Sequence, residues 1–140
     1  MASRGVYYVV EPEVAGELGP GTSFDRSVSP VTVTRLELRF TNWLGDALVE
    51  STPCFIVTAA LAERITREGL TGVAFDAVTV TLSPEGEELI DESLPQWLWL
   101  KITGWPGASD FGRNDDLTLV VSERALSVLQ ESGLDNAVVV

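Results

Sequence analysis

The sequence contains no histidine and a single cysteine among its 140 residues. Without an imidazole, Ser–His–Asp hydrolysis, Cys–His chemistry, His-ligated zinc and acid–base catalysis by histidine are excluded. One cysteine also excludes an intramolecular disulfide and a zinc site built from cysteines. Cys54, in the segment PCFIV, is expected to be a small buried apolar residue, because no histidine is present to activate it as a nucleophile.

Basic residues are scarce as well: 9 Lys and Arg stand against 21 Asp and Glu, which gives a net charge of −12. Such a surface repels phosphate backbones, so nucleic acid is not an expected partner, whereas a basic protein would be attracted and would associate faster. The apolar runs are too short to cross a bilayer, and the N-terminal residues lack a signal-peptide pattern. We expect a single cytoplasmic domain, residues 1–140, without membrane contact.

Two segments share one pattern, FIVTAALAERITREGLTGVAF at residues 55–75 and LVVSERALSVLQESGLDNAVV at residues 119–139. Each predicts a strand, a helix and a second strand. Thr58 and Ser122 are suited to cap the helices, since a hydroxyl oxygen can accept from a free N–H group. Gly69 and Gly133 are expected to end them in the left-handed conformation. Internal duplication and independent recurrence of a stable unit both explain the match.

The phrase VVSERALSVLQESGL, following WLWLKITGWPGASDFG, resembles a loose group of bacterial proteins related to the immunity proteins of polymorphic toxin systems. FIVTAALAERITREGLTGVAFDAVTVT fits the same group, so the resemblance covers about residues 55–139. The shared positions are helix caps, helix stops and core residues. The resemblance therefore implies a fold and an inhibitory binding role, but it assigns no functional residue.

The remaining pattern is rich in strands. Residues 6–10 are β-branched and aromatic, and residues 36–40 and 78–82 alternate apolar with polar side chains. Glycine and proline predict loops at 15–30 and 104–116. We expect an α+β fold, a mixed and mainly antiparallel β-sheet with two short helices, in which the two strand–helix–strand units supply one or two parallel pairs.

Residues 83–95 concentrate acidic side chains and are expected to form either a solvated loop or a recognition surface for a cationic partner. The spacing of these acids lacks the alternating ligands and central glycine of a calcium loop, so no metal is expected. The acidic residues are Glu85, Glu87, Glu88, Asp91 and Glu92.

The tryptophans that follow leave two alternatives. Trp97 and Trp99 alternate with leucines in WLWLKI, so both faces of this strand are covered, or the two tryptophans lie exposed beside Trp105. Burial is favoured because tryptophan usually hides most of its area. An exposed pair would be an interaction patch.

Two functions follow from these patterns. The first is a non-enzymatic, immunity-type inhibitor that covers a basic protein, such as a toxin, through the acidic residues and tryptophans; it needs no cofactor, and self-association stays open. The second is a small enzyme or ligand-binding domain that uses carboxylates of the second loop. Those residues, which the first hypothesis also counts in its partner surface, are Asp110, Asp115 and Asp116.

Overall fold

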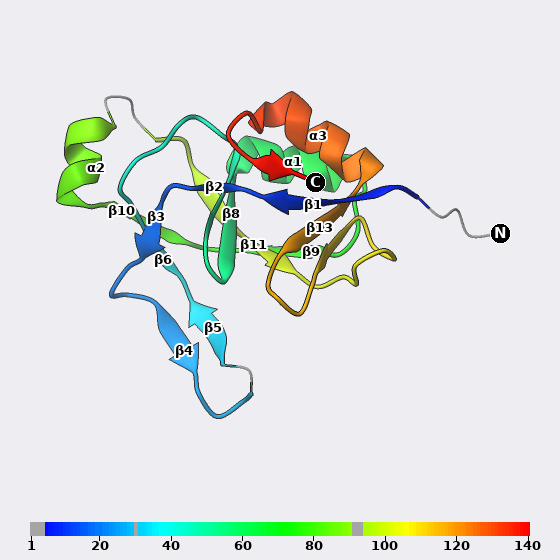
Figure 1. Ribbon diagram of the computed structural model, residues 1–140. Coiled ribbons are helices and arrows are strands. Elements are labelled where there is room, and N and C mark those ends of the chain that lie inside the picture. Colours follow the sequence, from blue (N-terminus) through cyan, green and yellow to red (C-terminus); the bar gives the residue numbers. More distant parts are fainter. Residues whose placement is uncertain (1–4, 30, 91–93) are drawn as a thin grey trace.

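The computed structural model in Figure 1 describes residues 5–29, 31–90 and 94–140, which form fourteen strands and three helices. The strands are mainly antiparallel, which confirms the α+β class, but there are three helices rather than two. In chain order the elements are β1 (Tyr7–Glu11), β2 (Glu13–Val14), β3 (Gly16–Leu18), β4 (Ser23–Asp25), β5 (Thr32–Arg35), β6 (Glu37–Phe40), β7 (Leu48–Ser51), β8 (Cys54–Thr58), α1 (Ala59–Arg67), β9 (Val73–Asp76), β10 (Thr79–Leu82), α2 (Pro84–Leu89), β11 (Trp97–Ile102), β12 (Phe111–Arg113), β13 (Leu119–Ser122), α3 (Glu123–Gly133) and β14 (Val138–Val139).

A five-stranded sheet, in the order β2-β7-β8-β11-β9, is buried on both faces at its centre. Because side chains alternate along a strand, Phe55 and Val57 of β8 enter one core and Cys54 and Ile56 enter the other. The first core also contains α1, α3 and the four-stranded sheet β12-β13-β1-β14. The second core is closed by the three-stranded sheet β10-β6-β3.

Both predicted helix starts are confirmed. The Thr58 hydroxyl accepts from the Leu61 N–H at 3.2 Å, and the Ser122 hydroxyl accepts from the Ala125 N–H at 3.1 Å. These bonds satisfy donors that an uncapped first turn would leave free.

The two helix ends differ in detail. Gly69 has φ +68°, and the N–H groups of Gly69 and Leu70 bond back to the carbonyls of Thr66 and Ile65, which is the predicted Schellman ending. Gly133 also has a positive φ, of +117°, but its carbonyl accepts from the Ala47 N–H at 2.9 Å. The second glycine therefore ends α3 and joins it to the loop before β7.

The units form a split strand–helix–strand arrangement. β8 and β9 are parallel to each other, and β11 lies antiparallel between them; β13 and β14 flank β1 in the same way. Neither unit therefore supplies the directly paired parallel strands that the sequence suggested. The direct parallel pairs are β6–β10 and β2–β7.

The helices of the two units lie side by side on one side of the sheets (Figure 1). Helix α1 buries Leu61, Ala62 and Ile65, and each large side chain hidden in this way contributes about 1.5–3 kcal/mol. Across the helix pair, Arg64 donates to Glu131 at 2.8 Å. The repeated units therefore share one core.

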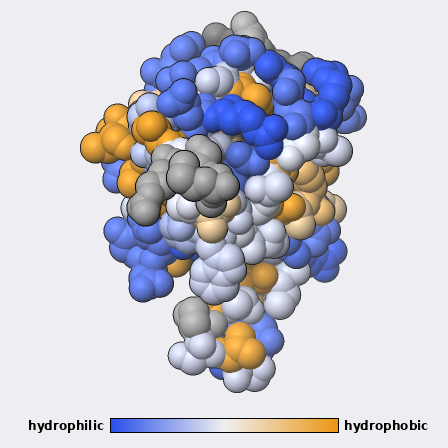
Figure 2. All heavy atoms as spheres, turned by 90° about the vertical axis from the view of Figure 1, so that its right-hand side faces the viewer, coloured by the Kyte–Doolittle hydropathy of each residue, from blue (hydrophilic) through white to orange (hydrophobic). Residues whose placement is uncertain are grey.

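Strands β4 and β5 form a separate two-stranded arm that projects from the body of the molecule (Figures 1 and 2). Figure 2 shows the hydrophilic surface at the top of the molecule and apolar atoms on the arm at the bottom. Phe24 and Val28 are exposed there, and the Arg26 guanidinium lies 5.2 Å from the Phe24 ring centre. The segment 15–30 is therefore not the irregular loop that its glycines and prolines predict.

Replacing Gly69 with alanine should destabilise the protein by about 1 kcal/mol, because an L-residue is disfavoured at φ +68°. A Cβ there would meet nothing within 4 Å, so the cost is conformational rather than steric. Urea unfolding measures the change. Gly5→Ala, which has room and no positive φ, is the matched control, and equal stability of both variants would contradict this helix ending.

Candidate functional site

The predicted acidic loop contains the short helix α2, which begins at a Ser83 cap whose hydroxyl accepts from the Gly86 N–H at 3.0 Å. Glu85, Glu87 and Glu88 lie exposed on this helix. Asp91 and Glu92, the other two predicted acids, lie outside the described residues. The sequence SPEGE carries the signals of a helix start that the sequence analysis missed. A serine cap, proline at the first helical position and acidic residues in the first turn all favour a helix.

Trp97 and Trp99 are each 6% exposed, so the prediction that both belong to a partner surface is wrong. The three-stranded sheet covers this face of β11. The Trp97 ring lies 5.3 Å from that of Phe40 and 5.7 Å from that of Trp43, while the Lys101 ammonium lies over the Trp99 ring at 4.4 Å. These tryptophans are core residues, as the favoured alternative expected.

Trp105 is 76% exposed, but it does not join the acids of α2 in one surface. It lies in the segment between β11 and β12, at the end of the molecule opposite to α2 (Figure 1). The predicted partner surface is therefore divided between two ends of the fold.

Asp110 joins the two repeated units. Its carboxylate accepts from the Thr71 N–H at 2.8 Å, the Ser122 hydroxyl at 2.7 Å and the Arg124 guanidinium at 2.9 Å. Burial raises the pKa of Asp110, but the hydrogen bonds from Arg124, Thr71 and Ser122 outweigh it and hold the pKa at about 2. The Asp110 carboxylate thus holds the residues that follow α1 against the start of α3.

The other acids of this loop do not converge on Asp110. Asp116 accepts from the N–H and hydroxyl of Thr118, at 3.2 and 2.6 Å, and Asp115 is exposed. Within the described ranges, no group of three or more carboxylates, cysteines or histidines is placed to hold a metal ion. The arrangement gives no support to a catalytic carboxylate cluster at Asp110–Asp116.

A different set of carboxylates lines a cavity of about 560 Å³ at the β2 edge of the five-stranded sheet. Glu11 comes from the end of β1, Glu13 from β2 and Glu50 from β7. The cavity's other polar side chains are Asn42, Thr52, Asp116, Thr118 and Asn136.

Glu13 occupies an inward position of β2 and is 6% exposed. Its Oε2 accepts from the Leu44 N–H at 2.6 Å, whereas Oε1 is buried and finds no hydrogen-bond donor among the described residues. Burial raises the pKa of Glu13, against the effect of the Leu44 and Asp46 N–H groups. A buried carboxylate oxygen without a donor is uncommon, because it has lost its hydration and gained nothing in return.

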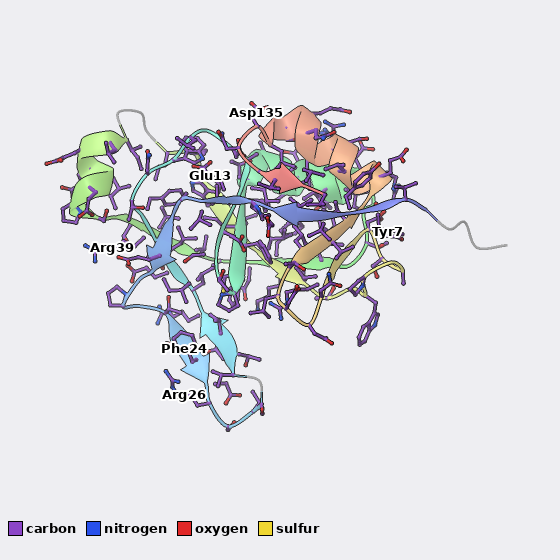
Figure 3. All side chains as sticks on the ribbon, in the orientation of Figure 1. Tyr7, Glu13, Phe24, Arg26, Arg39 and Asp135 are labelled. Atoms are coloured by element: carbon purple, nitrogen blue, oxygen red, sulfur yellow. The ribbon has the colours of Figure 1, made fainter. Side chains whose placement is uncertain are left out.

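Glu50 faces the same cavity and is half-buried. Burial raises its pKa, and the negative charge of Glu11 adds to the effect. Among the described residues, four cations form ion pairs: Arg64, Arg67, Lys101 and Arg124. None of these ion pairs includes Glu11, Glu13 or Glu50. Figure 3 shows Arg26 on the arm, well away from Glu13, and Arg39 below helix α2. The cavity is thus acidic and uncompensated by the described cations.

Exposed apolar side chains surround this acidic cavity. Val14 is 68% exposed and Leu44 is 61% exposed, and Leu117 and Val138 complete the set. Exposed apolar side chains that gather in one place are a common mark of an interaction surface.

Asp46 fixes the wall of the cavity. It is 1% exposed and accepts from the N–H groups of Asp135 and Asn136, at 3.0 and 2.9 Å, and from the Asn136 side-chain amide at 2.9 Å. These bonds hold the loop that follows α3 against the loop that precedes β7. The site is therefore built on an anchored frame.

Sequence reasoning missed this site, apart from Asp116. Glu11, Glu13 and Glu50 come from different strands, and no motif links them. The available signal was weak: glutamate within otherwise apolar strand segments, at VVEPEV and LVES. Cys54 is buried as predicted, and burial raises its pKa to about 11, against a smaller effect of Arg113.

Comparisons with protein-family models, with curated proteins and with solved structures find no match to this chain. The resemblance to immunity proteins therefore stays a prediction. Over the part of the chain that the structure describes, no helix has the length and apolar character to cross a membrane.

Replacing Asp110 with asparagine should cost about 2 kcal/mol of unfolding free energy near pH 7, since its pKa falls from 3.8 to about 2 on folding. The folded pKa is depressed, so this stability is present above pH 3.8 and is lost as the pH falls toward 2. Urea unfolding at several pH values measures it. Asp115→Asn, at an exposed site, should change little; equal effects of both substitutions, or a difference from wild type that persists at pH 2, would refute the junction role.

Proposed function

We propose that the protein is a non-enzymatic inhibitor that binds a basic protein and covers its active surface, as immunity proteins do. The observation that carries this proposal is the neighbouring pair of acids Glu11 and Glu50 in a cavity with a rim of exposed apolar side chains. Tight interfaces combine apolar contacts, which slow dissociation, with complementary charge, which speeds association and selects the partner.

The charge of the whole chain supports the same role. A net charge of −12 attracts a basic protein over long range, and this attraction weakens as salt screens it. Helix α2, with exposed Glu85, Glu87 and Glu88, adds to this field. It lacks a neighbouring tryptophan surface, so we assign it to steering rather than to close contact.

The alternative enzyme or ligand-binding role at Asp110–Asp116 is not favoured. A catalytic acid or base at neutral pH needs a pKa moved toward 7, but the pKa of Asp110 is lowered and its oxygens accept from three residues. We retain the inhibitor role alone. Its cytoplasmic location stays a prediction, and self-association stays open.

The proposal can be tested on a partner captured from source cells by cross-linking, identified and then purified. Wild type is compared with two doubly neutralised variants, Glu11→Gln with Glu50→Gln in the cavity and Glu87→Gln with Glu88→Gln on α2. Both remove two charges, so both should slow association a few-fold at low salt. The cavity variant alone should also speed dissociation, by about tenfold.

Surface plasmon resonance at low and high salt gives the rates, and a stoichiometric activity assay of the partner tests inhibition. An acidic or neutral partner, association indifferent to salt, or a partner that stays fully active when bound would contradict the proposed function.

A further inference from the structure

Strand β9 is the last strand of the five-stranded sheet, and one of its edges is open. It pairs with β11 on one side, and no strand among residues 5–29, 31–90 and 94–140 pairs with its other side. The opposite end of the sheet is β2, which has only two residues and an inward glutamate. An open edge strand of four residues offers its backbone N–H and C=O groups to a further strand.

The pairing with β11 identifies the backbone groups that face outward. Along an antiparallel strand, every second residue is hydrogen-bonded to the neighbouring strand, and the residues between them point to the other side. The Thr103 N–H donates to the Gly72 carbonyl at 2.8 Å, so in this register the even-numbered residues of β9 bond to β11. The N–H and C=O groups of Val73 and Phe75 therefore point outward, along the open edge.

An apolar groove lies beside this edge. Its volume is about 420 Å³, and α1 lines one wall while Phe75 and Leu98 line the other. The side chains of Val73 and Phe75 face the helix side of the sheet and are half-buried. A further strand at this edge would therefore gain apolar contacts as well as hydrogen bonds.

The charge around the groove differs from that of the whole chain. Helix α1 and strands β9 and β11 carry three bases, Arg64, Arg67 and Lys101, and two acids, Glu63 and Asp76. Their net charge is +1, against −12 for the chain. Glu63 pairs with Arg67, and Asp76 pairs with Lys101. A second copy of this acidic protein meets less repulsion here than an average part of the surface would give.

We infer that two copies of the chain pair through their β9 edges, antiparallel and about a two-fold axis beside Ala74. Val73 of each copy lies opposite Phe75 of the other, so the outward N–H and C=O groups of both residues are bonded. Ala74 lies opposite Ala74 of the second copy, and Asp76 lies opposite Gly72. No like charges face each other in this register, and the apolar side chains of both copies share the groove.

Charged substitutions at Ala74 test the pairing, because this residue is exposed in one copy and meets itself in the pair. Ala74→Lys and Ala74→Glu should each raise the dimer dissociation constant about fivefold, since like charges then lie directly opposite. An equimolar mixture of the two variants should restore the affinity. Thr34→Lys, at an exposed strand position of the arm, is the matched control and should have little effect. Sedimentation equilibrium from micromolar to millimolar protein gives the constants.

Amide hydrogen exchange reads the open edge directly. The Val73 and Phe75 amides should exchange more slowly as the protein concentration rises. The Ala74 amide already bonds to β11, so its exchange should not change. Added salt should tighten the dimer, because it screens the repulsion between two chains of charge −12, whereas it weakens a complex with a basic partner. The two kinds of association are therefore distinguishable.

Three results would overturn the inference: a protein that stays monomeric at millimolar concentration, equal effects of Ala74→Lys and Thr34→Lys, or no recovery when the two Ala74 variants are mixed. Protection of the Val73 and Phe75 amides only in the complex with a captured basic partner would also overturn it, and would assign the edge to a strand of that partner. The proposed function is independent of these outcomes, since a monomer can inhibit a basic protein equally well.

Discussion

Burial of the central sheet on both faces is the constraint on which the rest of this structure depends. β8 and β11 carry apolar side chains in both directions, so each face needs its own cover. The helix pair and the four-stranded sheet cover one face, and β3, β6 and β10 cover the other. Trp97 and Trp99 are core residues for this reason, and α2 and the arm extend from the second cover rather than from the repeated units.

In both repeated units, a strand from another part of the chain lies between the two strands of the unit. β11 follows its unit in the sequence and enters between β8 and β9, whereas β1 precedes its unit and enters between β13 and β14. Strand and helix patterns are local and repeat readily, but the inserted strand must come from elsewhere. Asp110 joins one unit to the other, because its carboxylate oxygens accept hydrogen bonds from residues of both units.

Local chemistry made much of the fold predictable. The hydroxyl caps at Thr58 and Ser122, the positive φ of Gly69 and the alternation in β6 depend on neighbours within a few residues. The segment 15–30 was predicted as a loop from its glycines, but glycine is needed there for close packing. A Cβ on Gly16 would overlap the Arg39 carbonyl, so glycine here permits close strand approach in β3 rather than a turn. That reason depends on a strand more than twenty residues away.

The cavity could not be predicted for a similar reason, since its acids meet only when β1, β2 and β7 come together. β2 is a two-residue edge strand, and an inward glutamate on such an edge discourages another strand from pairing with it. That role explains a charge at position 13, but a charge at the solvated rim would serve equally well. It does not explain why one oxygen of Glu13 is buried without a hydrogen-bond donor among the described residues. Burial without full hydrogen bonding disfavours the ionised form, so the pKa of Glu13 is raised, and the same holds at Glu50, where the negative charge of Glu11 adds to the effect of burial.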